Sequence, residues 1–151
     1  MTFKETQEKQ VETISESLSE FALALQFEQI PVAVSAQAKL HMLDAIGIGI
    51  ASSGFDFAKK TLQALISLQE SNDQQYPVLG VPEKLSMRDA ILVNGTYIHG
   101  LDFDDTHAAG VIHASSSAMA ALLSVGQRYK IGGKEALVAY LAAIEVASRI
   151  A

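Results

Sequence analysis

Apolar residues at helical spacing dominate the chain. Near the N-terminus they recur at steps of three and four between Glu, Ser, Gln and Thr, at Val11, Ile14, Leu18, Phe21, Ala22 and Leu25. This stripe predicts an amphipathic helix with one buried face. The same spacing predicts further helices over residues 31–51, 57–66, 87–101, 115–125 and 134–149. The pattern therefore indicates an all-α fold.

The second segment also allows another interpretation. Pro31 suits the first turn of a helix, where a missing N–H costs nothing. That helix would run through Leu40, Leu43 and Ile46 and end at the sequence Ser52-Ser53-Gly54. The run Gly47-Ile48-Gly49-Ile50 alternates like a strand, but within a helix its glycines would permit close helix–helix contact.

Local signals mark the remaining boundaries. Residues 76–81 are short and bounded by Pro and Gly, so they are the best candidate for a strand or an extended connector. Ser86 begins a capping pattern with Asp89, and Ser115–Ser117 can cap the helix that follows them. Asn94-Gly95 resembles a hairpin turn, but the flanking residues alternate poorly. Glu145 and Arg149 are spaced for an ion pair on the last helix. We expect at most one or two short strands.

Composition and charge narrow the classes of function. The 151 residues are 49% hydrophobic and 19% charged, with a net charge of −6 and no Cys. Nucleic acid and anionic membranes need a basic face, so neither is an expected partner. The apolar stretches Leu40–Ala51 and Ala136–Ala147 are shorter than the roughly 18–20 residues of a membrane span. With no targeting segment visible, we expect a cytoplasmic protein.

Candidate chemistry concentrates between two predicted helices. The run from His99 to His107, followed by His113, places three carboxylates and three imidazoles within fifteen residues. Such a connection can supply proton donors and acceptors near neutral pH. It can equally be a solvated acidic connector, because Asp and Thr are favoured at turns and helix caps. His41 and His99 fit apolar helix patterns, so we interpret both as core residues.

Two further interpretations of this run fit less well. Asp and His at short spacing could hold a divalent cation, but the spacing matches no well-defined ligand set, so we expect no metal site. Asp102, Asp104 and Thr106 also fit the Asp-x-Asp-x-Thr pattern of haloacid-dehalogenase-like phosphatases. That motif follows a buried strand in an alternating β/α chain, and no such alternation surrounds it here. The phosphatase interpretation would predict Mg²⁺-dependent release of phosphate from a generic ester.

The wider context carries a more specific resemblance. Asn94-Gly95, then the sequence Asp102-Phe103-Asp104-Asp105-Thr106-His107, then His113 resemble the MmgE/PrpD family. That family includes 2-methylcitrate dehydratase, cis-aconitate decarboxylase and iminodisuccinate epimerase. Leu43-Asp44-Ala45-Ile46-Gly47 resembles an early helix of the family, and the segment from Gly133 through Glu145 to Arg149 resembles a later one. The resemblance extends from about Pro31 to the end.

The resemblance implies a fold and an activity. Family members have a large all-α domain into which a smaller α+β domain is inserted. Residues 1–151 are similar to the N-terminal part of the helical domain only, so the second domain is expected to be absent from this chain. The strongly apolar and uncapped end of the last predicted helix fits that expectation. Members act by acid–base chemistry on small polycarboxylates, without a metal or an organic cofactor.

The resemblance also implies roles for individual residues. His113 would be the general acid or base, and Asp102 would orient it or bind substrate. Thr106, Asn94 and His107 are the candidate substrate-binding residues. Asp104, Asp105 and His107 are also expected to shape the loop, cap the next helix or pair with groups elsewhere. The sequence departs from the family at Ala114, where Pro is usual, which should loosen the start of the following helix.

The charge pattern limits what this chain can do alone. No Lys or Arg occurs from Asp89 to Gln127, so a polycarboxylate would need cations from elsewhere. We therefore expect a 2-methylcitrate dehydratase-like protein that is inactive as these 151 residues, with cis-aconitate decarboxylation or iminodisuccinate epimerisation as alternatives. A non-catalytic helical module is the alternative of another class. In either case exposed apolar faces predict a homodimer or higher self-association.

Overall fold

The computed structural model describes residues 13–69 and 75–151. In chain order its elements are α1 (Ile14–Ala24), a short 3₁₀ helix (Phe27–Gln29), α2 (Val32–Ser52), α3 (Asp56–Ser67), β1 (Tyr76–Pro77), β2 (Lys84–Leu85), α4 (Met87–His99), α5 (Ala114–Tyr129) and α6 (Gly133–Ile150). β1 and β2 pair antiparallel, with Tyr76 opposite Leu85. The predicted all-α fold with at most two short strands is confirmed.

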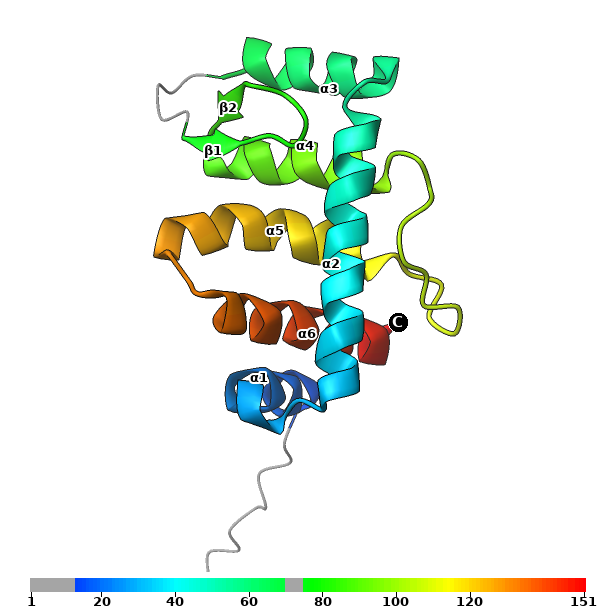
Figure 1. Ribbon diagram of the computed structural model, residues 1–151, viewed down its shortest axis with the longest axis vertical. Coiled ribbons are helices and arrows are strands. Elements are labelled where there is room, and N and C mark those ends of the chain that lie inside the picture. Colours follow the sequence, from blue (N-terminus) through cyan, green and yellow to red (C-terminus); the bar gives the residue numbers. More distant parts are fainter. Residues whose placement is uncertain (1–12, 70–74) are drawn as a thin grey trace, which may run out of the picture.

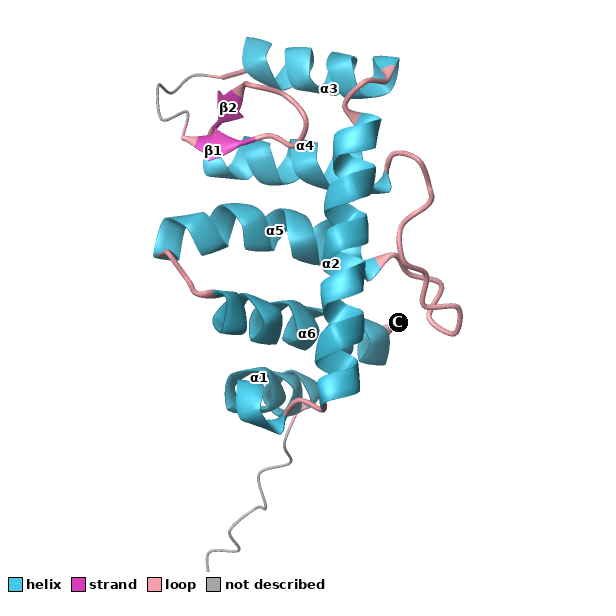
Figure 2. Cartoon of the chain, in the orientation of Figure 1, coloured by secondary structure: helices cyan, strands magenta, loops and turns pink. Residues whose placement is uncertain are grey.

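The helices form a layer that one long helix crosses. In Figure 1, α3, α4, α5, α6 and α1 lie one below another, and α2 runs across them. Figure 2 shows the small hairpin of β1 and β2 beside α4, below α3. The strand expected within residues 76–81 is therefore present, and residues 47–50 belong to α2 rather than to a strand.

Two apolar clusters hold these elements together. One joins α2, α5 and α6 to the end of α4, through Ala38, Ala45, Ile98, Met119, Ala120, Leu137, Tyr140 and Leu141. The other joins α3 and α4 to the hairpin, through Ala58, Leu62, Tyr76, Val78, Leu85, Ala90, Val93 and Tyr97. Tyr97 is fully buried and donates its hydroxyl to the carbonyl of Ala58 at 3.2 Å. Since α4 contributes to both clusters, its C-terminal end is firmly placed.

Several predicted boundaries are confirmed by specific contacts. The Ser86 hydroxyl accepts from the backbone N–H of Asp89 at 3.3 Å and donates to its carboxylate at 2.8 Å, so the predicted cap of α4 is present. The Glu145–Arg149 ion pair forms at 2.8 Å. Asn94-Gly95 lies inside α4 and not at a hairpin turn. Val11 and most of the polar run that follows α3 lie outside the described residues.

The burial predicted for the first helix was wrong in part, and α2 is also only partly covered. The stripe of α1 is only partly covered, by α6, and Ile14 remains 77% exposed. On α2, Leu40 and Leu43 are 58% and 66% exposed, because the layer of helices covers the opposite side of that helix. Periodicity identified these helices correctly but did not show how much of each apolar face has a partner within the chain.

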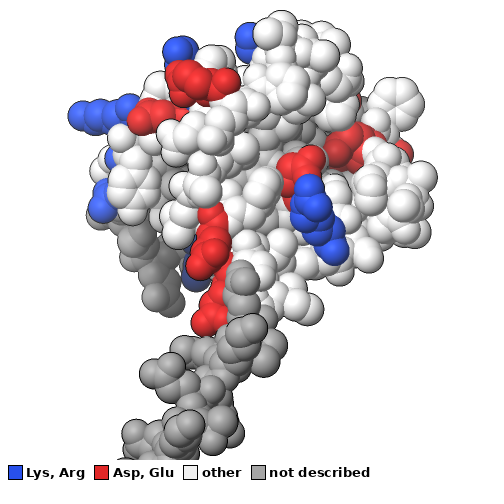
Figure 3. Space-filling model, turned by 90° about the horizontal axis from the view of Figure 1, so that it is seen from below, with Lys and Arg blue, Asp and Glu red and all other residues white. Residues whose placement is uncertain are grey.

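The described surface carries charges of both signs. On the face seen in Figure 3, Lys, Arg, Asp and Glu occur in small separate groups on a mostly uncharged surface. Among residues 13–69 and 75–151, no helix combines the length and the apolar character needed to cross a bilayer.

Candidate active site

The candidate residues lie on the connection between α4 and α5. This loop projects from the bundle beside the C-terminal end of α6 (Figure 1). Asp102 turns the chain as it leaves α4, with a left-handed φ of 51° and its backbone N–H donated to the carbonyl of His99 at 2.8 Å. Further along, the backbone N–H of His107 donates to Ile112 at 2.9 Å, which closes a small hairpin. The loop therefore returns to the start of α5.

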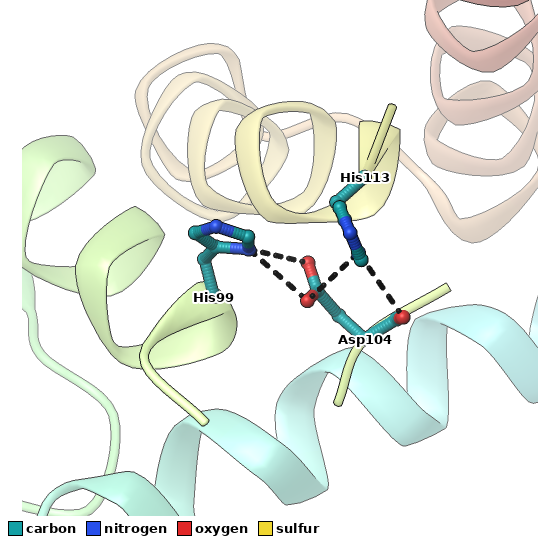
Figure 4. A group of neighbouring side chains, drawn as sticks. All are labelled: His99, Asp104 and His113. Carbon is teal, nitrogen blue, oxygen red and sulfur yellow. Dashed lines mark hydrogen bonds and ion pairs between the residues drawn. The ribbon is translucent and has the colours of Figure 1, made fainter. Parts of the chain in front are cut away.

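A buried carboxylate lies at the centre of the site. The Asp104 side chain is 1% exposed. Its Oδ1 lies 3.1 Å from Nδ1 of His99 and 3.3 Å from Nδ1 of His113 (Figure 4). The Asp104 carbonyl also lies 3.3 Å from Nδ1 of His113. One aspartate thus holds two imidazoles, whose ring centroids are 5.1 Å apart.

This arrangement determines which nitrogen of His113 is free. A carboxylate can only accept hydrogen bonds, so the imidazole nitrogen that faces it must carry the proton. We therefore assign the proton of neutral His113 to Nδ1, which leaves a lone pair on Nε2. That nitrogen lies 3.7 Å from Oδ1 of Asp102, whose side chain is 82% exposed. The free nitrogen of His113 is therefore oriented by Asp104 and lies near an exposed carboxylate.

The next aspartate fixes the start of α5. Oδ1 of Asp105 accepts from the backbone N–H of Ser115 at 3.1 Å, in the first turn of that helix. This contact confirms that a loop aspartate caps the following helix, and α5 begins at Ala114 without the family's usual proline. Because His113 is the residue immediately before α5, the cap also fixes the backbone that carries the imidazole.

A buried tyrosine supports the same helix start from α6. The hydroxyls of Tyr140 and Ser115 form a hydrogen bond within the interior. Burial raises the pKa of Tyr140 above its ordinary value; the Ser115 hydrogen bond opposes this, and the charges of Asp105 and Asp44 add to it. Tyr140 therefore stays neutral at physiological pH and keeps a hydroxyl proton for this bond.

The predicted substrate-binding residues occupy three different places. Thr106 lies beside the histidine, with Oγ1 3.5 Å from Nδ1 of His113. His107 is exposed, and its Nδ1 accepts from the backbone N–H of Gly110 at 3.2 Å, so it shapes the loop. Asn94 is fully buried in α4, where its amide bonds Leu79 at 2.9 Å and Pro77 at 3.1 Å. The structure does not bring Asn94 to the site.

A cavity opens next to the two imidazoles. Its volume is about 720 Å³, and it lies between the end of α4, the start of α5 and the end of α6. His99 and His113 line it, together with small residues that include Ala114, Ser116, Ser117, Ala143 and Ala147. No Lys or Arg is among these lining residues. The cavity is large enough for a small organic acid, but the described residues around it provide no cation other than histidine.

Sequence reasoning missed His99 as a member of the site. Its place in the apolar pattern of α4 suggested a core residue, whereas the side chain is 51% exposed and turned toward Asp104. The signal that could have found it is its position as the last residue of α4, where a side chain can face the following loop. The core interpretation of His41 was also wrong, because its ring is partly exposed and lies 2.9 Å from the Gln37 amide.

Comparison with known proteins gives the family. The family profile described as "MmgE/PrpD N-terminal domain" matches residues 16–151. The chain belongs to the MmgE/PrpD family. Its residues 16–151, and so the α4–α5 loop with Asp102, Asp104 and His113, fall within this MmgE/PrpD region.

Several curated proteins share the MmgE/PrpD sequence at low identity. A cis-aconitate decarboxylase of Mus musculus is 27% identical over 146 residues, which is 93% of this chain and 29% of that protein. The cis-aconitate decarboxylase-like protein oryM of Aspergillus oryzae is 25% identical over 129 residues, which cover 85% of this chain and 26% of that protein. A cis-aconitate decarboxylase of Aspergillus terreus is 24% identical over 142 residues, which cover 91% of this chain and 29% of that protein. The chain thus spans less than a third of these relatives.

Proposed function

We propose that this chain carries acid–base residues of an MmgE/PrpD-type enzyme that acts on a small polycarboxylate, with His113 as general acid or base. The observation that carries the proposal is the contact between Nδ1 of His113 and the buried Asp104 carboxylate, at 3.3 Å. Since this contact leaves Nε2 unprotonated in the neutral ring, the imidazole can accept a proton there and later return it.

The chemistry requires a proton to move at a carbon next to a carboxylate. In dehydration, Nε2 would remove that proton while hydroxide leaves the neighbouring carbon with a proton from an acid. In decarboxylation, loss of CO₂ leaves an electron pair on carbon, and the imidazolium would deliver its proton there. Both reactions need a histidine that is held in one orientation at the edge of a cavity.

Two neighbours of His113 complete the proposed site. Asp102 is exposed, and its Oδ1 lies 3.7 Å from Nε2 of His113, where it would stabilise the imidazolium or bind a substrate hydroxyl. The Thr106 hydroxyl lies beside Nδ1 of His113 and donates to the Asp104 carbonyl at 3.4 Å, so it would have to turn away from that carbonyl to donate a hydrogen bond to a substrate carboxylate. We assign Asp104 as a positioning residue, because it is buried and touches the histidines.

We propose cis-aconitate as the first substrate to test, because the matched relatives are named as cis-aconitate decarboxylases. Dehydration of 2-methylcitrate and epimerisation of iminodisuccinate are the alternatives within the family. All three substrates are polyanions, whereas the loop carries three aspartates and the cavity lining has no Lys or Arg. We therefore expect the 151-residue chain alone to give no useful turnover.

The test uses the protein that the complete native gene encodes and measures its turnover of each of the three substrates. We expect His113→Asn to lower kcat by about 10²–10⁴-fold, the usual contribution of a general acid or base. Asp104→Asn should lower kcat more than it changes KM and should alter the pH profile, because the tautomer of His113 is no longer fixed. His41→Ala, on α2, is the matched control and should leave turnover unchanged.

Two results would contradict the proposal: a His113→Asn variant with full activity, and no turnover of any of the three acids by the native product. Robust turnover by the 151 residues alone would contradict only the expectation that these residues are inactive by themselves. Circular dichroism on each variant separates a loss of chemistry from a loss of fold.

A further inference from the structure

We propose that His99, Asp104 and His113 form a binding site for one zinc-type divalent cation. Each residue offers one ligand atom, and these three atoms all lie within 4.8 Å of one another. The three residues come from the end of α4, the loop and the start of α5 (Figure 4). The sequence spacing alone predicted no metal site, because the ligands meet only when the loop folds back.

Two of the three ligand–ligand distances fit a tetrahedral ion. Zinc binds imidazole nitrogen and carboxylate oxygen at about 2.0–2.2 Å, so neighbouring ligand atoms in a tetrahedron lie about 3.3 Å apart. Oδ1 of Asp104 lies 3.1 Å from Nδ1 of His99 and 3.3 Å from Nδ1 of His113. The two distances to Asp104 therefore have the required length, and the ligand atoms of His99 and His113 lie within 4.8 Å of each other.

Burial and charge favour a cation at this position. The Asp104 carboxylate is 1% exposed, and the contacts described for it come from two imidazoles. A buried carboxylate is stabilised when a positive charge replaces lost hydration. Asp102 and Asp105 add negative charge nearby, and the chain has no Lys or Arg between Asp89 and Gln127. The same negative electrostatic potential that repels a polycarboxylate therefore attracts a metal cation.

The ligand set also indicates which class of cation would bind. Two imidazoles and one carboxylate suit zinc and similar transition ions, whereas Mg²⁺ prefers oxygen ligands and keeps its waters. Since His99 and His113 line the 720 Å³ cavity, a water molecule could take the fourth position from that side. The site would therefore have three protein ligands and one open position.

Occupation of this site would remove His113 from acid–base chemistry, a consequence that rests on the proposed function. A metal on Nδ1 shifts the remaining ring proton to Nε2, so that nitrogen loses its lone pair. The binding itself does not depend on any catalytic role of the histidine. It can be measured without substrate.

The test is calorimetric titration of the 151-residue chain, stripped of metal with a chelator and dialysed, with Zn²⁺ and separately with Mg²⁺. We expect one Zn²⁺ per chain and no binding of Mg²⁺ under the same conditions. His99→Ala removes a half-exposed ligand and should weaken Zn²⁺ binding at least about tenfold, as should Asp104→Asn. His107→Ala and His41→Ala, which remove histidines outside the group, should bind as the unchanged chain does.

Specific outcomes of the Zn²⁺ titrations would overturn the proposed site. Absence of Zn²⁺ binding by the unchanged chain would overturn the inference, as would a His99→Ala variant that binds Zn²⁺ normally. An equal loss in His107→Ala would also overturn it, because the exposed loop histidines would then be the ligands. Circular dichroism confirms that each variant keeps its helices. Since no substrate is present, failure of the proposed function would leave a positive zinc result unchanged.

Discussion

Three aspartates within four residues have three different environments. The carboxylate of Asp104 is buried between two imidazoles, that of Asp105 caps α5, and that of Asp102 is 82% exposed near Nε2 of His113. Their sequence neighbourhoods are almost identical, so local composition does not assign these roles. The turn at Asp102, with its positive φ, and the return of the loop to α5 decide which carboxylate faces inward.

Another aspartate gives a prediction about acid stability. Asp89 in the first turn of α4 is 4% exposed. A hydrogen bond from Arg88 holds the pKa of its carboxyl below the ordinary value of 3.8; burial opposes this shift, and the Ser86 hydroxyl adds to it. A lowered folded-state pKa stabilises the protein above pH 3.8, and this contribution is lost as the pH falls through the folded-state pKa.

We therefore expect Asp89→Asn to lower the free energy of unfolding by about 0.3–1 kcal/mol at pH 7, because a carboxylate in the first turn of a helix is stabilised by the helix dipole. The difference from the unchanged chain should shrink as the pH is lowered below 4. Urea unfolding at pH 7, 5 and 3, followed by circular dichroism, measures it. Glu20→Gln, an exposed carboxylate on α1, is the control. A difference that stays constant from pH 7 to 3 would show that the Asp89 charge has no such role.

The candidate site was predictable only in part from individual residues. His113, Asp102 and Thr106 were found through the family motif, and the structure brings them together. His99 was missed because helical periodicity treats every position of a stripe alike, although the last residue of a helix can face the next loop. Asn94 shares the motif but bonds Pro77 in β1 and Leu79 in the turn of the hairpin, because its position in α4 faces the hairpin.

At the scale of elements, the glycines of α2 show what periodicity can and cannot establish. The pattern predicted a helix over this segment and close contact at its glycines, without showing which glycine makes the contact. A Cβ on Gly49 would lie 2.5 Å from Cδ1 of Leu79 and 3.2 Å from Cγ1 of Ile98. A Cβ on Gly47 would have nothing within 4 Å. Only the packing of α4 and the hairpin against α2 makes the two positions different.

These two glycines form a matched pair for a stability measurement. Gly47→Ala should raise the free energy of unfolding by up to about 1 kcal/mol, because alanine favours the helix. Gly49→Ala gains the same preference but forces Leu79 and Ile98 to move, so it should lower stability by about 1–3 kcal/mol. Chemical unfolding of both variants gives the comparison. If Gly49→Ala proved as stable as Gly47→Ala, the close approach of α2 to α4 would be incorrect.

At the scale of the whole molecule, hydrophobic burial is incomplete. The number and order of helices followed from the spacing of apolar residues, since each stripe needs a covering partner. Spacing does not show whether that partner lies in the same chain. Along α2 the exposed side of the helix forms a shallow groove of about 600 Å³ with the α4–α5 loop, lined by Leu40, Leu43, Asp44, Gly47, Ile48, Ala51, Leu101 and Phe103. The apolar spacing of α2 therefore identified the helix but not which of its apolar residues are covered within the chain.

We expect this groove to mediate self-association of the 151-residue chain. Leu43 is 66% exposed and Phe103 is 77% exposed, and clustered apolar groups of this kind are rarely left in water. Leu43→Gln should therefore shift the chain toward monomer, because burial of that leucine in a dimer would contribute about 1.5–3 kcal/mol. Sedimentation velocity over a range of concentrations, with a chelator present to exclude bridging by zinc, gives the distribution of monomers and oligomers.

Leu68→Gln is the control: it changes a leucine that is 70% exposed at the end of α3, outside the groove, and this variant should associate as the unchanged chain does. A chain that stays monomeric at every concentration, or one that Leu43→Gln and Leu68→Gln affect equally, would show that the groove is not the self-association surface.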